Sequence, residues 1–186
     1  MVVTVSPMDK HGYFTLAASA IMEWERMLRA KKLIVEVASH APRVFGDTHI
    51  HLSQVDAIVE SDRYPAALSP QPPDEVDRQL GRVVAELVED GSTIQLGIGN
   101  IPNAVANELR SKRHLGIHTE MFADGVLPLY EKGVVNNMNK KFDKGKIVST
   151  FLMGSKRVYD FIDDNPGVAM MDVGYTNDPF IIAQQP

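Results

Sequence analysis

The chain has 186 residues, of which 44% are hydrophobic, so it can bury a core in one domain or in parts of two. Its formal net charge of −5 argues against nucleic acid as a partner. Cysteine is absent, which excludes disulfides, zinc–thiolate sites and cysteine nucleophiles and fits a reducing, cytoplasmic setting. No apolar run approaches the ~20 residues of a membrane span, so no membrane partner is expected.

The first third of the chain has an alternating pattern. Apolar, β-favouring runs predict strands at residues 2–5, 33–38 and 56–60. Apolar residues about one turn apart predict a helix over residues 16–30. Residues 39–53 hold three of the six histidines and are expected to form a long loop.

A proline-rich segment then divides the chain. The sequence SDRYPAALSPQPP carries four prolines, each of which fixes φ and removes a backbone donor. It predicts an inter-domain linker at residues 62–73. The expected organisation is therefore a first domain part over residues 1–61 and a second over residues 74–186.

The second part opens with the strongest helical pattern in the chain. Asp74 precedes apolar residues that recur at helical spacing from Val76 to Val88, and Gly91 suits the position past the helix end. Strands alternate with helices from there on, which predicts a parallel α/β sheet. The later predicted elements are a helix at 126–131, a polar loop at 133–145, a strand at 146–152, a helix at 155–163 and a strand at 167–173.

The stretch from Thr93 to Gly125 organises this second part. A short strand at residues 93–96 leads into the turn Gly97–Ile101, and a helix at residues 103–110 follows. A second strand at residues 115–119 ends in Glu120. Parallel strands of a right-handed βαβ unit end at the same edge of the sheet, where ligands bind. Glu120 and the N–H groups of the turn are therefore expected to face one crevice.

Spacing alone leaves several interpretations of this stretch open. The glycine turn nearly matches a dinucleotide fingerprint, with Glu120 about 20 residues on, but Pro102 stands where the third glycine belongs. It also lacks the Gly-Lys-Ser/Thr ending of a P-loop. A purely structural turn is as well supported as a functional one. An ordinary solvated charge is the simplest interpretation of Glu120, although its apolar flanks favour a site.

Other polar residues predict less. His49 and His51 could supply two metal ligands, but no convincing third ligand is visible, so no metal site is expected. Residues 176–179 predict a turn and a helix start.

Several motifs in order carry a family resemblance. They are Gln95–Pro102 (QLGIGNIP), His118–Met121 (HTEM) with Asp124-Gly125, Thr150–Gly154 (TFLMG) and Tyr175–Phe180 (YTNDPF). Together they resemble the acetyl-CoA hydrolase/transferase family, and within it the 4-hydroxybutyrate CoA-transferase branch. The resemblance runs over nearly the whole chain, with a departure at Ala38, where asparagine is expected.

The resemblance implies a CoA-transferase. It would move CoA between an acyl-CoA, such as acetyl-CoA, and a short carboxylic acid, such as 4-hydroxybutyrate, through a glutamyl-CoA thioester. CoA is then a substrate, and no permanently bound cofactor is expected. Glu120 would be the nucleophile, and Gln95, His118 and Asp124 are supporting candidates. The residues implied in binding CoA and substrate and in forming the oxyanion site are Gly97, Ile98, Gly99, Asn100 and Ile101.

The resemblance also implies an organisation. The expected fold class is α/β, with Rossmann-like, parallel-sheet domains of the NagB/RpiA/CoA-transferase type. The chain would be an internal piece holding the end of the first domain and the start of the second. We expect such a piece to be inactive alone and the whole protein to be a homo-oligomer. The alternatives are an acyl-CoA hydrolase, a dinucleotide-binding domain and a non-catalytic remnant that binds partners.

Overall fold

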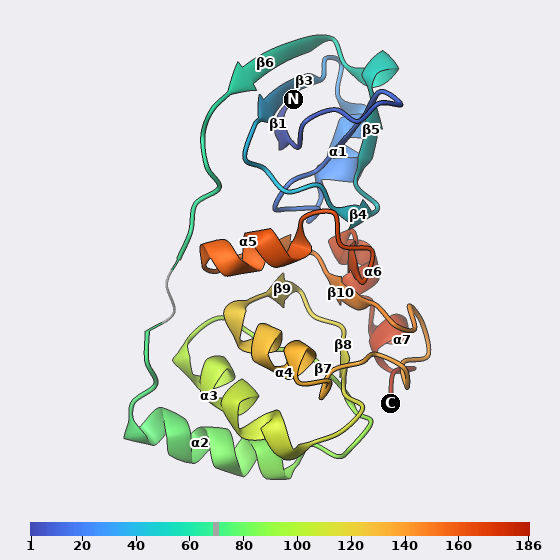
Figure 1. Cartoon of the computed structure of the whole chain (residues 1–186). Coiled ribbons are helices and arrows are strands. Elements are labelled where there is room, and N and C mark those ends of the chain that lie inside the picture. The colour runs from blue at the N-terminus through green and yellow to red at the C-terminus, as the bar shows by residue number, and fades with distance from the viewer. Residues whose placement is uncertain (69–70) are drawn as a thin grey trace.

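The computed structural model describes residues 1–68 and 71–186 and is a mixed α/β fold with parallel sheets (Figure 1). The strands are β1 Val2–Val5, β2 Tyr13–Thr15, β3 Ile34–Ala38, β4 Phe45–Gly46, β5 His49–His51, β6 Ala57–Ser61, β7 Thr93–Ile94, β8 Gly116–Ile117, β9 Met121–Phe122, β10 Ile147–Ser149, β11 Phe151–Leu152 and β12 Val168–Met170. The α-helices are α1 Glu23–Arg29, α2 Glu75–Glu86, α3 Asn100–Glu108, α4 Leu127–Glu131, α5 Lys156–Ile162, α6 Val173–Thr176 and α7 Pro179–Ile182. Short 3-10 turns lie at Leu52–Gln54, Leu109–Ser111 and Asp124–Val126.

The first sheet is parallel, with β3 between β1 and β6. Val35 at its centre is fully buried, as expected for a β-branched residue in a central strand. The strand predictions at residues 2–5, 33–38 and 56–60 are confirmed. Along one side of the view, the chain then passes from β6 toward α2 at the opposite end of the molecule (Figure 1). Two residues of the predicted linker, 69 and 70, lie outside the described residues.

The βαβ unit is confirmed. β7 pairs in parallel with β8, and α3 connects them. Val105 of the helix and Leu109, which follows it, are both buried. A further parallel bridge joins His118 to Val148 and so connects β8 to β10. The edge where these strands end carries the candidate site.

The predicted helix over residues 16–30 is wrong in its first half. α1 begins only at Glu23, and the preceding residues run extended. Leu16 bridges to Val5, Ser19 bridges to Phe151, and Ala20 N–H donates to Thr150 O at 2.8 Å. Backbone pairing with two distant segments outweighs the helix propensity of this alanine-rich stretch.

The predicted loop at residues 39–53 is also wrong in part, because it contains β4, β5 and a 3-10 turn. β5 pairs antiparallel with β2, whereas β4 pairs in parallel with β12. The first part of the chain thus adds a strand to the β10–β12 sheet of the second part. Gly46 permits this, because its φ is +108° and a Cβ there would lie 2.1 Å from Met170 O.

The helix predicted from Asp74 is confirmed, with the Asp74 carboxylate accepting from Asp77 N–H at 2.8 Å as its N-cap. The face of α2 that packs in the structure is not the face that carries its large apolar residues. α2 contacts α3 through the small residues Gly81 and Ala85, and a Cβ at position 81 would lie 2.9 Å from Ala104 C. The apolar side chains on its other faces are exposed, among them Val76 at 63%.

Among the described residues, none of the helices combines the length and apolar character that a membrane crossing requires.

Candidate active site

The glycine turn follows β7 as predicted. Gly99 adopts φ +121° and caps α3, which begins at Asn100, so the left-handed backbone here favours glycine. Ile98 is 68% exposed, which is unusual for a large aliphatic side chain at the edge of a sheet. The turn lines a cavity of about 220 Å³ with Met121, Asp124 and other residues.

Glu120 directly precedes β9, and its backbone is firmly held. Its carbonyl oxygen accepts from Thr150 N–H at 2.9 Å, from Phe151 N–H at 3.1 Å and from Ser149 Oγ at 3.1 Å. These donors lie at the end of β10 and the start of β11. The partly buried side chain also has a partner, because Asn177 Nδ2 donates to Glu120 Oε2 at 2.8 Å. One carboxylate oxygen is therefore oriented by an amide.

The residue before Glu120 connects it to the glycine turn. Thr119 is fully buried, and its Oγ1 donates to Leu96 O at 3.1 Å. Side chains alternate along a strand, so Thr119 and Met121 face the turn while Glu120 faces Asn177. The structure thus brings the strand ends together, but Glu120 does not line the cavity of the turn.

His118 is buried behind Glu120. Its Nε2 lies 2.8 Å from Thr176 O, so this nitrogen carries the proton in the bond to the carbonyl. Burial and the nearby charge of Lys140 lower the pKa of His118, although its bond to Thr176 and the charge of Asp143 oppose this. A neutral His118 thus helps to hold the segment that carries Asn177.

Asp124 connects the end of β9 to the start of α5. Its carboxylate accepts from Ser155 N–H at 2.8 Å and from the Ser155 hydroxyl. A Cβ at Gly154 would lie 2.5 Å from Asp124 Oδ2, so the close approach of this backbone requires glycine. Gln95, the third supporting candidate, is exposed.

His49 and His51 lie on β5 in the first part of the chain. His51 Nδ1 lies 2.8 Å from Ser53 Oγ, and His49 Nδ1 lies 3.4 Å from Gly46 O. Within residues 1–68 and 71–186, no group of three or more histidine, aspartate or glutamate side chains could hold a metal ion.

Family comparisons bear on this geometry. The model of the acetyl-CoA hydrolase/transferase N-terminal domain matches residues 1–70, and that of the C-terminal domain matches residues 154–186. The chain belongs to this family.

Curated members of the family align along almost the whole chain. This chain is 46% identical over 180 residues to a succinyl-CoA:cyclohexane-1-carboxylate CoA transferase of Geobacter metallireducens, and the alignment covers 97% of this chain and 41% of that protein. It is also 44% identical over 180 residues to a 4-hydroxybutyrate coenzyme A transferase of Clostridium kluyveri, and the alignment covers 97% of this chain and 42% of that protein. The chain thus spans about two fifths of the length of these relatives.

Solved structures agree with the fold. RipA from Yersinia pestis superposes with a TM-score of 0.95 at 39% identity, over 99% of this chain and 43% of that one. A 4-hydroxybutyrate CoA-transferase from Porphyromonas gingivalis gives a TM-score of 0.95 at 36% identity, over 99% of this chain and 47% of that one.

Sequence reasoning missed the contacts of two residues, Asn177 and Lys140. Asn177 falls in a segment predicted only as a turn and helix start, and no local pattern shows that its amide reaches a residue 57 positions away. The Tyr175–Phe180 motif was the only signal. Lys140 falls in the predicted polar loop, yet its side chain is fully buried. Nothing in the spacing of that loop indicates burial.

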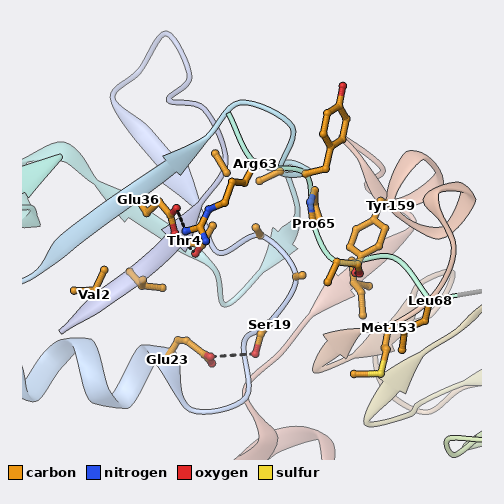
Figure 2. A pocket seen from close by; sticks show the side chains of 18 of the residues that line it. Val2, Thr4, Ser19, Glu23, Glu36, Arg63, Pro65, Leu68, Met153 and Tyr159 are labelled. Atoms are coloured by element: carbon orange, nitrogen blue, oxygen red, sulfur yellow. Dashed lines mark hydrogen bonds and ion pairs between the residues drawn. The ribbon is translucent and has the colours of Figure 1, made fainter. Parts of the chain in front are cut away.

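A larger cavity of about 750 Å³ lies between the first sheet, the proline-rich segment and the start of α5. Figure 2 shows Arg63 and Glu36, which form an ion pair, on one side of it, and Tyr159 on another. Leu68 and Met153 border both this cavity and that of the glycine turn. The two spaces are therefore neighbours, joined along an apolar rim.

Proposed function

We propose that this chain belongs to a CoA-transferase that moves CoA between an acyl-CoA and a short carboxylic acid, with Glu120 as nucleophile. The observation that most supports this proposal is the hydrogen bond from Asn177 Nδ2 to Glu120 Oε2 at 2.8 Å, in a member of the acetyl-CoA hydrolase/transferase family. It leaves the other carboxylate oxygen open to attack a substrate. Acids of the 4-hydroxybutyrate class are the proposed acceptors, because a relative bears that name.

The proposed chemistry uses a carboxylate as a covalent catalyst. One oxygen of Glu120 attacks the thioester carbonyl, the C–S bond breaks, and a mixed anhydride and CoA thiolate result. The thiolate then attacks the glutamyl carbonyl and releases the donor acid, leaving a glutamyl-CoA thioester. An acceptor carboxylate reverses both steps. The oxygen held by Asn177 is where negative charge collects when the thiolate attacks, so this amide supports that step.

We assign the glycine turn to CoA and substrate binding. The exposed backbone from Gly97 to Asn100 lines the small cavity, which Glu120 does not line. Its N–H groups are candidate donors to the oxygen of a thioester that reaches from this cavity to Glu120. One well-placed donor of this kind is typically worth ~3 kcal/mol to the reaction barrier. His118 and Asp124 support the site by holding the neighbouring segments, and CoA enters as a substrate.

The organisation of the whole protein is part of the proposal. The chain would hold the end of a first domain at residues 1–61, a linker at 62–73 and the start of a second domain at 74–186. β4 adds a strand from the first part to a sheet of the second, which would fix how the two parts meet. We propose a cytoplasmic homo-oligomer with no permanently bound cofactor.

The test replaces Glu120 in the complete protein. Glu120→Gln should lower acyl exchange by at least ~1,000-fold, because an amide cannot form the anhydride. Glu89→Gln, an exposed acid beyond α2, is the matched control and should retain full activity. Mass spectrometry should find CoA attached to the Glu120 peptide only in the wild type. Exchange near the wild-type rate in Glu120→Gln would rule out the nucleophile role.

An acyl-CoA hydrolase is the second candidate, because the family description includes both activities. In that case water would take the place of the acceptor acid. Release of free CoA without added acid, at a rate that acid does not raise, would identify the hydrolase.

A further inference from the structure

A gap between two strands lies behind Glu120. β8 and β10 meet at the bridge between His118 and Val148, where Thr119 N–H donates to Val148 O at 3.0 Å. One residue earlier, at Ile117, the backbone groups bind side chains instead. Residues 134–146 fill the space on that side.

Lys140 supplies one of these side chains. It is fully buried, and its Nζ donates to Ile117 O at 3.0 Å and to Lys146 O at 2.9 Å. Ile117 belongs to β8, and Lys146 immediately precedes β10. A single ammonium group therefore binds a carbonyl of β8 and the carbonyl just before β10, where backbone pairing would otherwise hold the two segments together.

The surroundings are shaped to this lysine. A Cβ at Gly116 would lie 2.7 Å from Lys140 Cγ, so the stem crosses β8 where there is no side chain. Asn137 completes the arrangement, because its Oδ1 accepts from Ile117 N–H at 2.9 Å. Both backbone groups of Ile117 are thus bound by side chains of one loop.

Stability alone gives little reason for an ammonium group here. Burial lowers the pKa of Lys140 to about 8, although the nearby charge of Asp143 opposes this. Removing a charge from water is costly, and neutral carbonyls offset that cost only in part. An apolar residue of the same length would avoid that cost but would leave the carbonyls of Ile117 and Lys146 without this donor.

The position of Glu120 depends on the same two strands. Glu120 lies three residues beyond Ile117, roughly 10 Å along an extended chain. Its carbonyl is held by Thr150 N–H and Phe151 N–H, which follow β10. Any change in the spacing of β8 and β10 therefore moves the backbone of Glu120.

We propose that Lys140 is a positioning residue, whose buried ammonium fixes the spacing of β8 and β10 and through them the backbone of Glu120. The consequence for catalysis rests on the proposed function of Glu120. The consequence for the strands does not, because it concerns backbone pairing alone.

The test is Lys140→Met in the complete protein, because methionine keeps most of the length and removes every donor. We expect kcat to fall about 10- to 100-fold, since a displacement of ~1 Å is enough for such a loss, with KM within about twofold of the wild type. Lys144→Met, an exposed lysine of the same loop, is the control and should leave both constants unchanged. Lys140→Gln keeps an amide donor and should lie between the two.

Hydrogen–deuterium exchange supplies a readout without catalysis. The amides of Thr119 and Thr150, which bind Val148 O and Glu120 O, join the segments that continue β8 and β10. They should exchange at least tenfold faster in Lys140→Met. The amides of Gly116 and His118 donate to Ser92 O and Ile94 O, on the side of β8 that faces β7. Their exchange rates should not change.

The outcomes separate the two proposals. Wild-type exchange at Thr119 and Thr150, or faster exchange with an unchanged kcat, would overturn the positioning role of Lys140. If Lys140→Met does not fold, Lys140→Gln decides by the same two measurements. An active Glu120→Gln would instead overturn the proposed nucleophile, and the exchange pattern would still test the contact between the strands.

Discussion

At the scale of single residues, the site depends on amide and ammonium groups that bind backbone or carboxylate oxygens. Asn177 orients the Glu120 carboxylate, and Lys140 holds the strand behind it. Each belongs to an irregular segment or a short helix end, and each acts on a residue far away in sequence. Such contacts contribute modestly to folding, but under the proposed function they decide where the attacking oxygen of Glu120 lies.

Asn177→Ala should lower kcat about 10- to 100-fold, because a hydrogen bond to a charged group is worth ~1.5–3 kcal/mol. Asn177 is exposed, so the melting temperature should change little. Asn107→Ala, an exposed asparagine on α3, is the control. Steady-state acyl exchange in the complete protein measures the effect, and an unchanged kcat in Asn177→Ala would show that the contact does not support the reaction.

At the scale of elements, β4 is the feature that joins the two parts of the chain. Its register with β12 places Gly46 opposite Met170. Arg43, just before β4, adds an ion pair to Asp9 at 2.9 Å, and its N–H donates to Asp163 Oδ1 at 2.8 Å. The backbone bonds of a short parallel pair are thus supported by charged contacts on both sides.

Gly46→Ala should destabilise the protein by about 2–4 kcal/mol, because φ of +108° strains an alanine and its Cβ would overlap Met170 O. The melting temperature should fall by about 5–15 °C for a chain of this size. Gly133→Ala is the matched control. Its φ is +72°, but no atom lies within 4 Å of an added Cβ, so only the conformational cost applies. Equal losses by calorimetry would show that the close approach of β4 to β12 is unimportant.

At the scale of the whole molecule, the chain contains the proposed nucleophile but spans about 41% of a curated relative's length. α2 carries exposed Val76 and Val83 on faces that α3 does not cover, and the exposed Leu87 follows the helix. An apolar surface of this kind favours association with another surface.

We therefore expect residues 1–186 alone not to exchange acyl groups, although Glu120 and Asn177 are in place. A carboxylate gains little on a thioester unless binding of the remote CoA arm is used to support the transition state. CoA release and acyl exchange should be measured for residues 1–186 and, side by side, for a complete protein of the relatives' length. Comparable rates for the two would contradict the expectation.

The sequence by itself determined several local elements and the family. β-branched runs predicted β1 and β3, and the order of strand, glycine turn and helix predicted the pairing of β7 with β8. These signals are local, because alternation and helical spacing report on neighbours along the chain. Motifs around Gly97 and Glu120 identified the family before any contact was known.

Only the tertiary structure decided which distant segments meet. Leu16 to Ala20 are extended because they pair with Val5 and Thr150–Phe151, and β4 forms because β12 lies beside it. Lys140 is buried because Ile117, 23 positions before it, offers a carbonyl in an enclosed space. The free energy of such contacts depends on partners far along the chain, so no local pattern could have indicated them.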